Sequence, residues 1–250
     1  MNYELTHIDL FSGIGGFSIA ARNAGFRTIG FSEVEPYACR VLAERFPGVP
    51  NLGDVRKCES FARLGAITVL TAGYPCQPES TAGLRRGKED YRWLWPAVDA
   101  ILPILRPAWF IGENVSNHVN MGLDQVLSDL EHRGYSAQPI VIPAAAVGAG
   151  HIRERVWIFA YANGDGRQKV GDKKSLLPEA ADAWDSGFDA TSLRQTVWGC
   201  SRPDGAEPLG MGNGIPNRAH RLKGLGNAIV PQVVEPFFHW IAQIERGEIT

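Results

Sequence analysis

The sequence predicts an α/β fold with a mostly parallel, doubly wound sheet and a small irregular lobe. Three observations support this prediction. Strand-like and helix-like segments alternate through residues 1–161, which is typical of a sheet whose strands are joined by crossover helices. A glycine-rich turn connects the first strand to the first helix. Beyond Tyr161, frequent Gly, Pro, Asp and Asn replace the periodic apolar runs, which indicates loops.

The first part of the chain is predicted to form a strand–turn–helix unit, followed by a second strand and a second helix. Gly25 suits the end of the first helix, because glycine adopts the left-handed conformation of a helix C-terminus at little steric cost. In chain order, we expect a strand at 7–11, a glycine turn at 12–16, a helix at 17–24, a strand at 28–32 and a helix at 36–46.

The alternation continues through the middle of the chain. Pro103 lies inside one of the predicted helices, and Gly134 stops the next one. We expect further strands at 66–72, 108–112, 135–142 and 156–161, with helices at 95–105 and 124–133. Regular structure resumes at 230–244, an apolar helix that we expect to pack back onto the first part of the chain.

Composition limits the classes of protein. The 250 residues are 44% apolar and 21% charged, which is ordinary for a globular protein, and no apolar run approaches the roughly 20 residues of a membrane span. The N-terminus is polar, so we expect a cytoplasmic protein without a secretion signal. The four cysteines form no C-x-x-C pair, so neither a metal site nor a disulfide framework is predicted. A net charge of −2 does not indicate a nucleic-acid partner, but such a partner needs positive charge on one face only.

The glycine turn is a candidate cofactor site. It follows a strand and opens a helix, and Glu33 lies about 20 residues beyond Gly13 at the end of the second strand, where a carboxylate can accept hydrogen bonds from ribose hydroxyls. Asp54 is a second carboxylate that suits an adenine amino group. The residues alone leave open a tight turn without a ligand, or a plain turn residue at Asp54. Ser18 stands where the dinucleotide fingerprint needs glycine, which disfavours a nicotinamide oxidoreductase.

A candidate nucleophile follows another strand. Cys76 lies in the sequence P-C-Q-P, between two prolines that present it rigidly at the predicted carboxyl end of a central strand. Ligand crevices of open α/β sheets lie at that edge. A structural cysteine would more often lie within the apolar run that precedes the turn.

Five short motifs occur together and in order. They are D-L-F-S-G-I-G-G-F at 9–17, P-C-Q-P at 75–78, E-N-V at 113–115, R-E-R at 153–155 and G-N-A at 226–228. In this combination the chain resembles the cytosine-C5 DNA methyltransferases of bacteria and phages, over residues 8–160 and from 221 to the C-terminus. The resemblance implies a Rossmann-like, S-adenosylmethionine-dependent methyltransferase domain.

The resemblance also implies roles for single residues. The positions that match cofactor-holding residues of the family are Phe11, Gly13, Gly15, Glu33, Asp54 and Asn227, with Phe11 against adenine. Cys76 matches the nucleophile, Glu113 the acid that engages cytosine, and Arg153 and Arg155 the active-site arginines. We expect three further residues to contact the substrate: Gln77, Ser80 and Asn114.

The chemistry explains these residue types. Attack of a thiolate on carbon 6 of cytosine turns the ring into an enamine that accepts a methyl group at carbon 5. A carboxyl group with a pKa raised by burial can protonate ring nitrogen 3. Without the resemblance, Glu113 would be read as a helix N-cap and the two arginines as a solvated charge run. Because the target base lies inside duplex DNA, it must be flipped out first.

One residue departs from the family pattern. Glu79 stands where relatives commonly have Phe, and a carboxylate so close to Cys76 should raise the pKa of the thiol. We hypothesise that Glu79 weakens or retunes the activity, which leaves a DNA-binding homologue without catalysis as an alternative. A second alternative is an RNA cytosine methyltransferase.

The expected organisation has three parts. Residues 1–161 form the catalytic and cofactor-binding domain, 162–220 a small target-recognition lobe, and 221–250 a segment that returns to the first domain. We expect double-stranded DNA as partner, no membrane and a monomer. The sequence does not reveal whether a partner restriction endonuclease exists.

Overall fold

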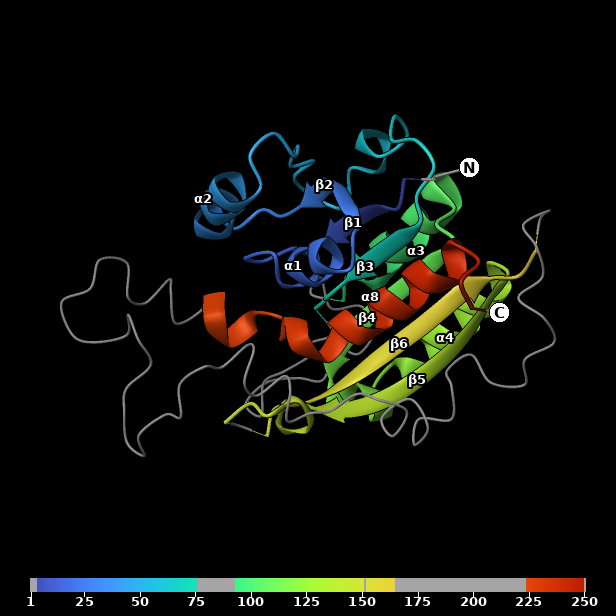
Figure 1. Ribbon diagram of the computed structural model, residues 1–250. Helices are drawn as coiled ribbons and strands as arrows, with labels where there is room; N and C mark the ends of the chain where they lie inside the picture. Colours follow the sequence, from blue (N-terminus) through green and yellow to red (C-terminus); the bar gives the residue numbers. More distant parts are fainter. Residues whose placement is uncertain (1–3, 76–92, 151, 165–223, 250) are drawn as a thin grey trace.

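A six-stranded sheet covered by helices forms the part of the chain that the structure describes (Figure 1). The structure is a computed structural model, and it describes residues 4–75, 93–150, 152–164 and 224–249. The strand order is β2-β1-β3-β4-β6-β5. Most of the predicted target-recognition lobe therefore lies outside the described residues.

The first four strands of the order are parallel. They are β2 (Arg27–Ser32), β1 (Thr6–Leu10), β3 (Val69–Ala72) and β4 (Trp109–Val115). Parallel neighbours need crossover connections, which place helices on the faces of the sheet. The carboxyl ends of these four strands consequently meet at one edge.

The last two strands reverse direction. β6 (Glu154–Ala162) is antiparallel both to β4 and to β5 (Tyr135–Pro143). The described residues between Pro143 and Glu154 include the short 3₁₀ helix η4 (Ala144–Val147), and this connection is too short for the crossover that a parallel pair requires. The sheet is thus mostly parallel, as predicted, with an antiparallel hairpin at one side.

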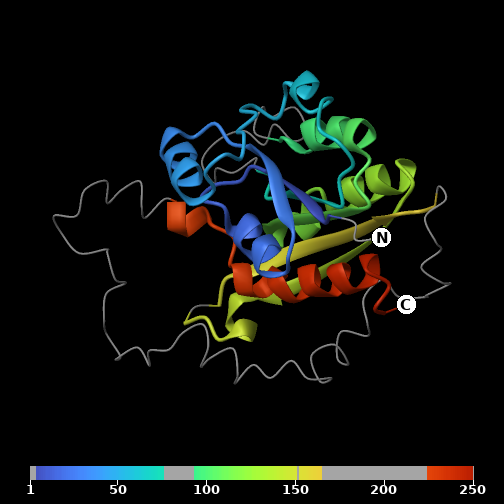
Figure 2. The ribbon, with the colours of Figure 1, turned by 45° about the horizontal axis from the view of Figure 1, so that its top comes forward.

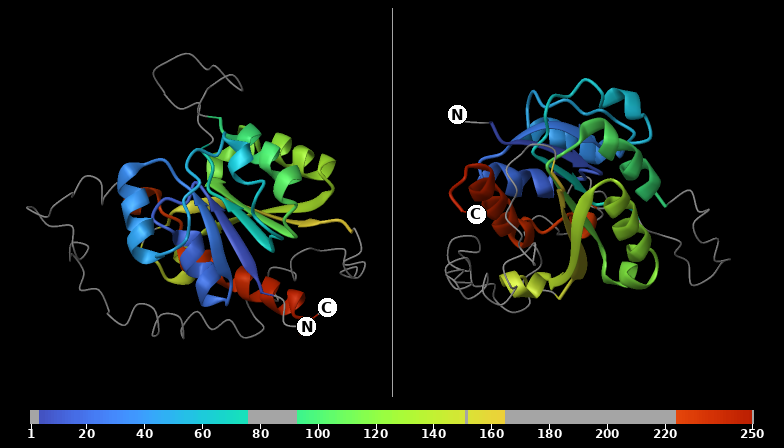
Figure 3. Two further views of the ribbon diagram at one scale, coloured as in Figure 1. Left: turned by 90° about the horizontal axis from the view of Figure 1, so that it is seen from above. Right: turned by 90° about the vertical axis from the view of Figure 1, so that its right-hand side faces the viewer.

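Helices cover both faces of the sheet (Figures 2 and 3). Because successive strand residues point to opposite faces, Leu70 and Phe110 pack with α3 and α4, whereas Val69 and Ile111 pack with α1 and α8. The helices are α1 (Gly16–Asn23), α2 (Pro36–Arg45), α3 (Trp95–Leu105), α4 (Leu123–His132) and α8 (Pro231–Glu245), with short 3₁₀ turns η1 (Cys58–Ser60) and η3 (Ser116–Asn120).

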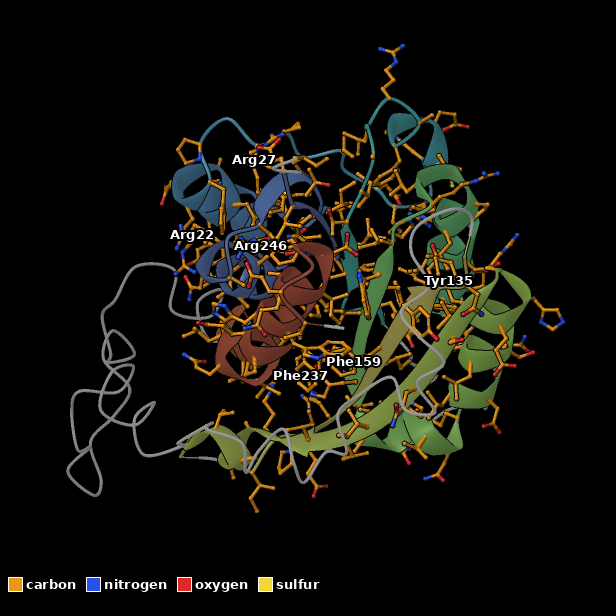
Figure 4. All side chains as sticks on the ribbon, turned by 45° about the vertical axis from the view of Figure 1, so that its right-hand side comes forward. Arg22, Arg27, Tyr135, Phe159, Phe237 and Arg246 are labelled. Atoms are coloured by element: carbon orange, nitrogen blue, oxygen red, sulfur yellow. The ribbon has the colours of Figure 1, made fainter. Side chains whose placement is uncertain are left out.

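The C-terminal helix α8 packs against α1 and the sheet. Phe237 stacks on Phe159 of β6 with ring centroids 4.1 Å apart (Figure 4). The Asn23 side chain of α1 donates to Glu235 at 3.0 Å, and the Trp109 indole of β4 donates to Glu245 at 2.9 Å. Residues from the far end of the sequence therefore complete the apolar layer on this face.

The observed helices and strands lie where the sequence predicts them, and their ends differ by a few residues. The predicted strand at 66–72 begins only at Val69, and the predicted helix at 95–105 matches α3 with Pro103 in its last turn. Gly25 has φ +86° after α1, in agreement with its predicted role. Within the described ranges, each helix is too short or too polar to traverse a bilayer.

Candidate functional site

The predicted site residues that the structure describes gather at the carboxyl edge of the parallel strands. The glycine turn follows β1, Glu33 follows β2, Gly73 follows β3, and Glu113 lies near the end of β4. Ligand crevices of open α/β sheets occur at this edge. Cys76, Gln77, Ser80 and Glu79 lie outside the described residues.

The turn after β1 needs its glycines. Gly13 and Gly15 have φ of +53° and +87°, which glycine adopts without strain. A Cβ on Gly15 would lie 2.7 Å from Cε2 of Phe46, whereas a Cβ on Gly13 would meet no atom within 4 Å. Phe11 also has a positive φ, 55°, an unusual conformation for an aromatic residue and one that occurs preferentially at ligand sites.

Glu33 connects this turn to the end of β2. Its carboxylate accepts hydrogen bonds from the backbone N–H of Gly13 at 2.7 Å and from those of Val34 and Glu35 at 2.8 Å. The Asn51 side chain accepts from the Glu33 N–H at 3.1 Å and donates to the Glu33 carbonyl at 3.0 Å. Glu33 is thus held firmly, with part of its surface exposed.

Asp54 lies on the neighbouring loop and is paired. Arg56 donates to both of its carboxylate oxygens, at 2.5 Å from Nη2 and 3.0 Å from Nε. These hydrogen bonds lower the pKa of Asp54 to about 2. Together, an anionic carboxylate, the glycine turn and Glu33 are donor and acceptor groups that fit the amino group and hydroxyls of an adenosine moiety.

A network of buried polar side chains centred on β1, the strand that precedes the glycine turn, was not predicted from the sequence. Asp9 is fully buried and accepts from the hydroxyls of Ser18 at 2.7 Å and Thr71 at 3.1 Å. His7, also buried, is hydrogen-bonded to Thr71 at 2.9 Å and Thr28 at 3.0 Å. Burial raises the pKa of Asp9 to about 7 and lowers that of His7 to about 3. The sequence does carry a signal for this network, because the polar residues His7 and Asp9 alternate with apolar residues along the strand.

Glu113 is the central acid of the site. Its side chain is 12% exposed, and Nε of Arg155 lies 3.1 Å from its Oε1. The antiparallel register places Arg155 opposite Val115, so that it reaches diagonally to the same face as Glu113. Burial raises the pKa of Glu113, while the charges of Arg155 and Arg153 oppose the rise. This agrees with the expectation of a carboxyl group adapted to hold a proton.

Arg153 makes different contacts from Arg155. Its Nη1 donates to the carbonyl of Gly226 at 2.5 Å and its Nη2 to the carbonyl of Ala228 at 3.0 Å. The two carbonyls flank Asn227, which is exposed. A cavity beside these groups is lined by Glu113, Ile142, Ala144, Arg153, Arg155, Trp157, Val230 and Val233.

The residues that precede Cys76 are anchored on β4 and η3. Asn114 donates from Nδ2 to the carbonyl of Tyr74 at 2.9 Å, and its Oδ1 accepts from the N–H of Val115. The hydroxyl of Tyr74 is hydrogen-bonded to Nε2 of His118 at 3.0 Å. Asn114 is therefore buried and engaged within the protein, and its expected contact with substrate stays a prediction. Tyr74 and His118 were missed because the contact joins residues 44 positions apart.

Gly73 places the end of β3 beside the acid. A Cβ at this position would lie 3.8 Å from Oε2 of Glu113 and 3.7 Å from Cδ1 of Ile229. The strand that leads into P-C-Q-P thus ends next to Glu113 and next to the returning C-terminal segment.

Comparison with known proteins gives a consistent result. The family model described as C-5 cytosine-specific DNA methylase matches residues 5–199. The chain is 34% identical over 187 residues to Type II methyltransferase M.HpaII of Haemophilus parainfluenzae, an alignment that covers 72% of this chain and 51% of that protein. It is 35% identical over 188 residues to Type II methylase M.HgiEI of Herpetosiphon aurantiacus, covering 72% and 41%.

The match to these relatives is partial in length. The chain spans about half the length of the curated relatives it matches. Among solved structures, S. pombe Dnmt2 methyltransferase aligns with a TM-score of 0.65 and 16% identity, covering 97% of this chain and 99% of that one. At this identity the likeness concerns the fold, which is that of the methyltransferase domain predicted from the sequence.

Proposed function

The chain belongs to the C-5 cytosine-specific DNA methylase family, and we propose that it transfers a methyl group from S-adenosylmethionine to carbon 5 of cytosine in duplex DNA. One observation carries the proposal within this chain. The largely buried Glu113, paired with Arg155, lies beside the end of the strand that leads into the P-C-Q-P sequence. The reaction needs an acid and a nucleophile, and here Glu113 lies near the end of β4 while Cys76 follows the neighbouring strand β3 in the sequence.

The cofactor would be held at the glycine turn. Glu33 would accept hydrogen bonds from the ribose hydroxyls, Asp54 from the adenine amino group, and Phe11 would lie against the adenine ring. Gly13 and Gly15 allow the backbone to approach the ligand, and Asn227 would help to close the pocket. When bound, S-adenosylmethionine supplies the electrophilic methyl group that carbon 5 of cytosine accepts.

Cys76 and Glu113 would divide the activation of cytosine between them. The Cys76 thiolate forms a bond to carbon 6, and the electron pair of the 5,6 double bond moves into the ring. Glu113 donates its proton to ring nitrogen 3, which neutralises the charge that attack creates. After methyl transfer, a base removes the proton from carbon 5, the carbon–sulfur bond breaks and the thiolate departs. Ring nitrogen 3 returns its proton to Glu113, which restores the acid.

The electrostatics of Glu113 suit this role. A carboxyl group in water would be ionised at neutral pH and would have no proton to give, but burial raises the pKa of Glu113. Arg155 opposes the rise and, through its contact with Oε1, fixes the direction of the carboxyl group. Activity carried by the protonated acid should fall as the pH rises through this pKa.

DNA would be bound by residues outside the described ranges. We propose that residues 162–220 form the target-recognition lobe, where basic side chains contact phosphate and read base edges in the major groove. The target cytosine would be flipped out of the duplex and contacted by Gln77 and Ser80. We propose that the protein acts as a cytoplasmic monomer.

The test is a methylation map. Purified protein is incubated with S-adenosylmethionine and duplex DNA of mixed sequence, and 5-methylcytosine is located at single-base resolution. We expect modification at one short sequence, and none with Cys76→Ser, which keeps the shape of the side chain but not its nucleophilicity. Modification that survives in Cys76→Ser would refute the assigned nucleophile.

Two additional arms separate the alternatives. Replacing the duplex by folded RNA tests an RNA substrate, and modification of RNA alone would refute the proposed substrate. Glu79→Phe tests the effect of the unusual carboxylate, and we expect this variant to be faster than the natural chain. An unchanged rate would show that Glu79 does not affect the chemistry.

A further inference from the structure

The segment 224–229, which we call the C-terminal segment, is held by Arg153 on one side and contacts the glycine turn on the other. We propose that Arg153 is a positioning residue: it latches the C-terminal segment onto the glycine turn and so sets the affinity for S-adenosylmethionine. This proposal rests on the proposed function for the identity of the ligand. It gives Arg153 a role separate from that of Arg155.

The contacts of Arg153 are those of a fork. Two nitrogens of one guanidinium donate to the carbonyls of Gly226 and Ala228, at 2.5 Å and 3.0 Å. A planar guanidinium presents its N–H groups in fixed directions, so that it can hold two acceptors at once, which a lysine ammonium does less well. Hydrogen bonds from a charged donor are also stronger than those between neutral groups. The residue between the two carbonyls, Asn227, is thereby fixed.

The backbone at Arg153 is adapted to this contact. Arg153 has φ +31°, in the region that favours glycine. Its carbonyl accepts a hydrogen bond from the N–H of Ala144 at 3.1 Å, which ties the residue to η4. Strained backbone persists where surrounding contacts over-determine it, and such positions concentrate at functional sites. The strain is consistent with a side chain that must be aimed at one target.

The opposite side of the C-terminal segment contacts the cofactor turn. A Cβ on Gly16 would lie 2.8 Å from both Cβ and the carbonyl oxygen of Ile229, so only glycine permits this approach. A Cβ on Gly224 would lie 3.3 Å from Cγ2 of Ile14. The segment therefore bridges Arg153, which immediately precedes β6, and the start of α1, where the turn ends.

Substitution of Arg153 and substitution of Arg155 should therefore affect different steps. Arg155 contacts Glu113, so its loss acts on the chemical step. Loss of the two Arg153 hydrogen bonds releases the C-terminal segment from the residue that precedes β6 and loosens its contact with Ile14 and Gly16. The effect should appear as weaker binding of S-adenosylmethionine, with a smaller effect on the rate at saturating cofactor.

The experiment compares Arg153→Ala and Arg153→Lys with Arg133→Ala. Arg133 is a matched control because it also makes a two-pronged contact, with Asp99, and lies on the α4 side of the sheet. Binding of S-adenosylmethionine is measured by calorimetry without DNA. We expect Arg153→Ala to bind S-adenosylmethionine at least tenfold more weakly than the natural chain, and Arg153→Lys to lose less affinity. Methylguanidinium should restore part of the affinity of Arg153→Ala, and Arg133→Ala should bind as the natural chain does.

Hydrogen exchange gives a readout that needs neither cofactor nor DNA. In Arg153→Ala, the amides of residues 225–230 should exchange at least several-fold faster, and those of β1 should not change. Arg153→Lys keeps the positive charge, and the same exchange measurement can be made on it if the alanine variant is too unstable. Unchanged cofactor binding with a reduced single-turnover methylation rate would overturn the proposal and make Arg153 a catalytic residue. Absence of cofactor binding by the natural chain would overturn it too, whereas binding without methylation would refute only the proposed function.

Discussion

Two carboxylates of this protein are each paired with an arginine, yet their pKa values move in opposite directions. At Asp54, hydrogen bonds from Arg56 lower the pKa to about 2. At Glu113, burial raises the pKa although Arg155 and Arg153 act against it. The arginine in the first pair is 65% exposed, and in the second it is 22% exposed. Burial, more than the presence of a cation, decides the direction in which the pKa of each carboxyl group moves.

This difference assigns separate tasks to the two ends of the site. Asp54 lies on a loop and stays anionic, which suits acceptance of hydrogen bonds from a ligand. Glu113 lies near the end of a central strand, under the returning C-terminal helix, where desolvation favours the neutral acid. The same carboxyl chemistry would thus serve the proposed ligand binding in one place and the proposed proton donation in the other.

The largest effect should follow from removing the acid. We expect Glu113→Gln to lower kcat for methylation by about 10²- to 10⁴-fold, the usual contribution of general acid catalysis, because an amide has no proton of suitable acidity to give. Single-turnover methylation with labelled cofactor measures the change. Cofactor binding should be retained, and a rate within threefold of the natural chain would remove Glu113 from the mechanism.

Asp9 extends the comparison to a buried carboxyl group without an arginine in its described contacts, whose pKa is raised to about 7 from 3.8. The folded state keeps a proton that the unfolded state releases, so the free energy of unfolding should decrease as pH rises from about 4 to about 7. Because one pKa unit corresponds to about 1.4 kcal/mol, the total loss is about 4 kcal/mol.

Asp9→Asn should remove this dependence. Urea unfolding of both proteins between pH 4 and pH 8 gives the difference in free energy of unfolding, in which the opposite titration of His7 cancels. As pH rises, the stability of the Asp9→Asn variant should increase relative to that of the natural chain. A difference that is constant with pH would show that Asp9 ionises normally in the folded protein.

The third prediction concerns removal of Arg155, the partner of Glu113. Arg155→Met should lower kcat by about 10- to 100-fold, since hydrogen bonds to charged groups contribute about 1.5–3 kcal/mol. With the opposing charge gone, the pKa of Glu113 should rise further. The pH–rate profile of the variant should therefore begin its decline at a higher pH, and a decline that moves to lower pH would contradict the assignment.

The smallest effect is expected at the exposed pair. Arg56→Ala should return the pKa of Asp54 toward its ordinary value and free its carboxylate for the ligand. Because exposed ion pairs contribute little, the affinity for S-adenosylmethionine should tighten by no more than about fivefold. Calorimetric titration measures it. Binding weakened tenfold or more would show that Arg56 itself contacts the cofactor.

The sequence predicts the glycine-turn end of the candidate site better than the Glu113 end, for a physical reason. The glycine turn and Glu33 depend on local backbone geometry, within about 20 residues of one strand–helix–strand unit. Glycines that need positive φ are visible in the sequence, and Gly13 and Gly15 have it. The strands and helices of the first half were predicted for the same reason.

The Glu113 end depends on contacts between distant residues. Arg153 reaches carbonyls 73 and 75 positions away, and Glu113 meets Arg155 only because β6 pairs antiparallel with β4. No periodicity of a single sequence specifies such a register. The motifs singled out these residues as candidates, but the separate contacts of the two arginines required the structure.

The most direct test of the account is the pKa of Glu113 itself. The ¹³C chemical shift of its side-chain carboxyl, assigned by its loss in Glu113→Gln, is followed against pH in protein labelled at glutamate. We predict a midpoint clearly above the ordinary 4.5, because burial outweighs the neighbouring arginines. A midpoint at or below 4.5 would mean that Arg155 governs the carboxyl group as Arg56 governs Asp54, and Glu113 would then have no proton to give at neutral pH.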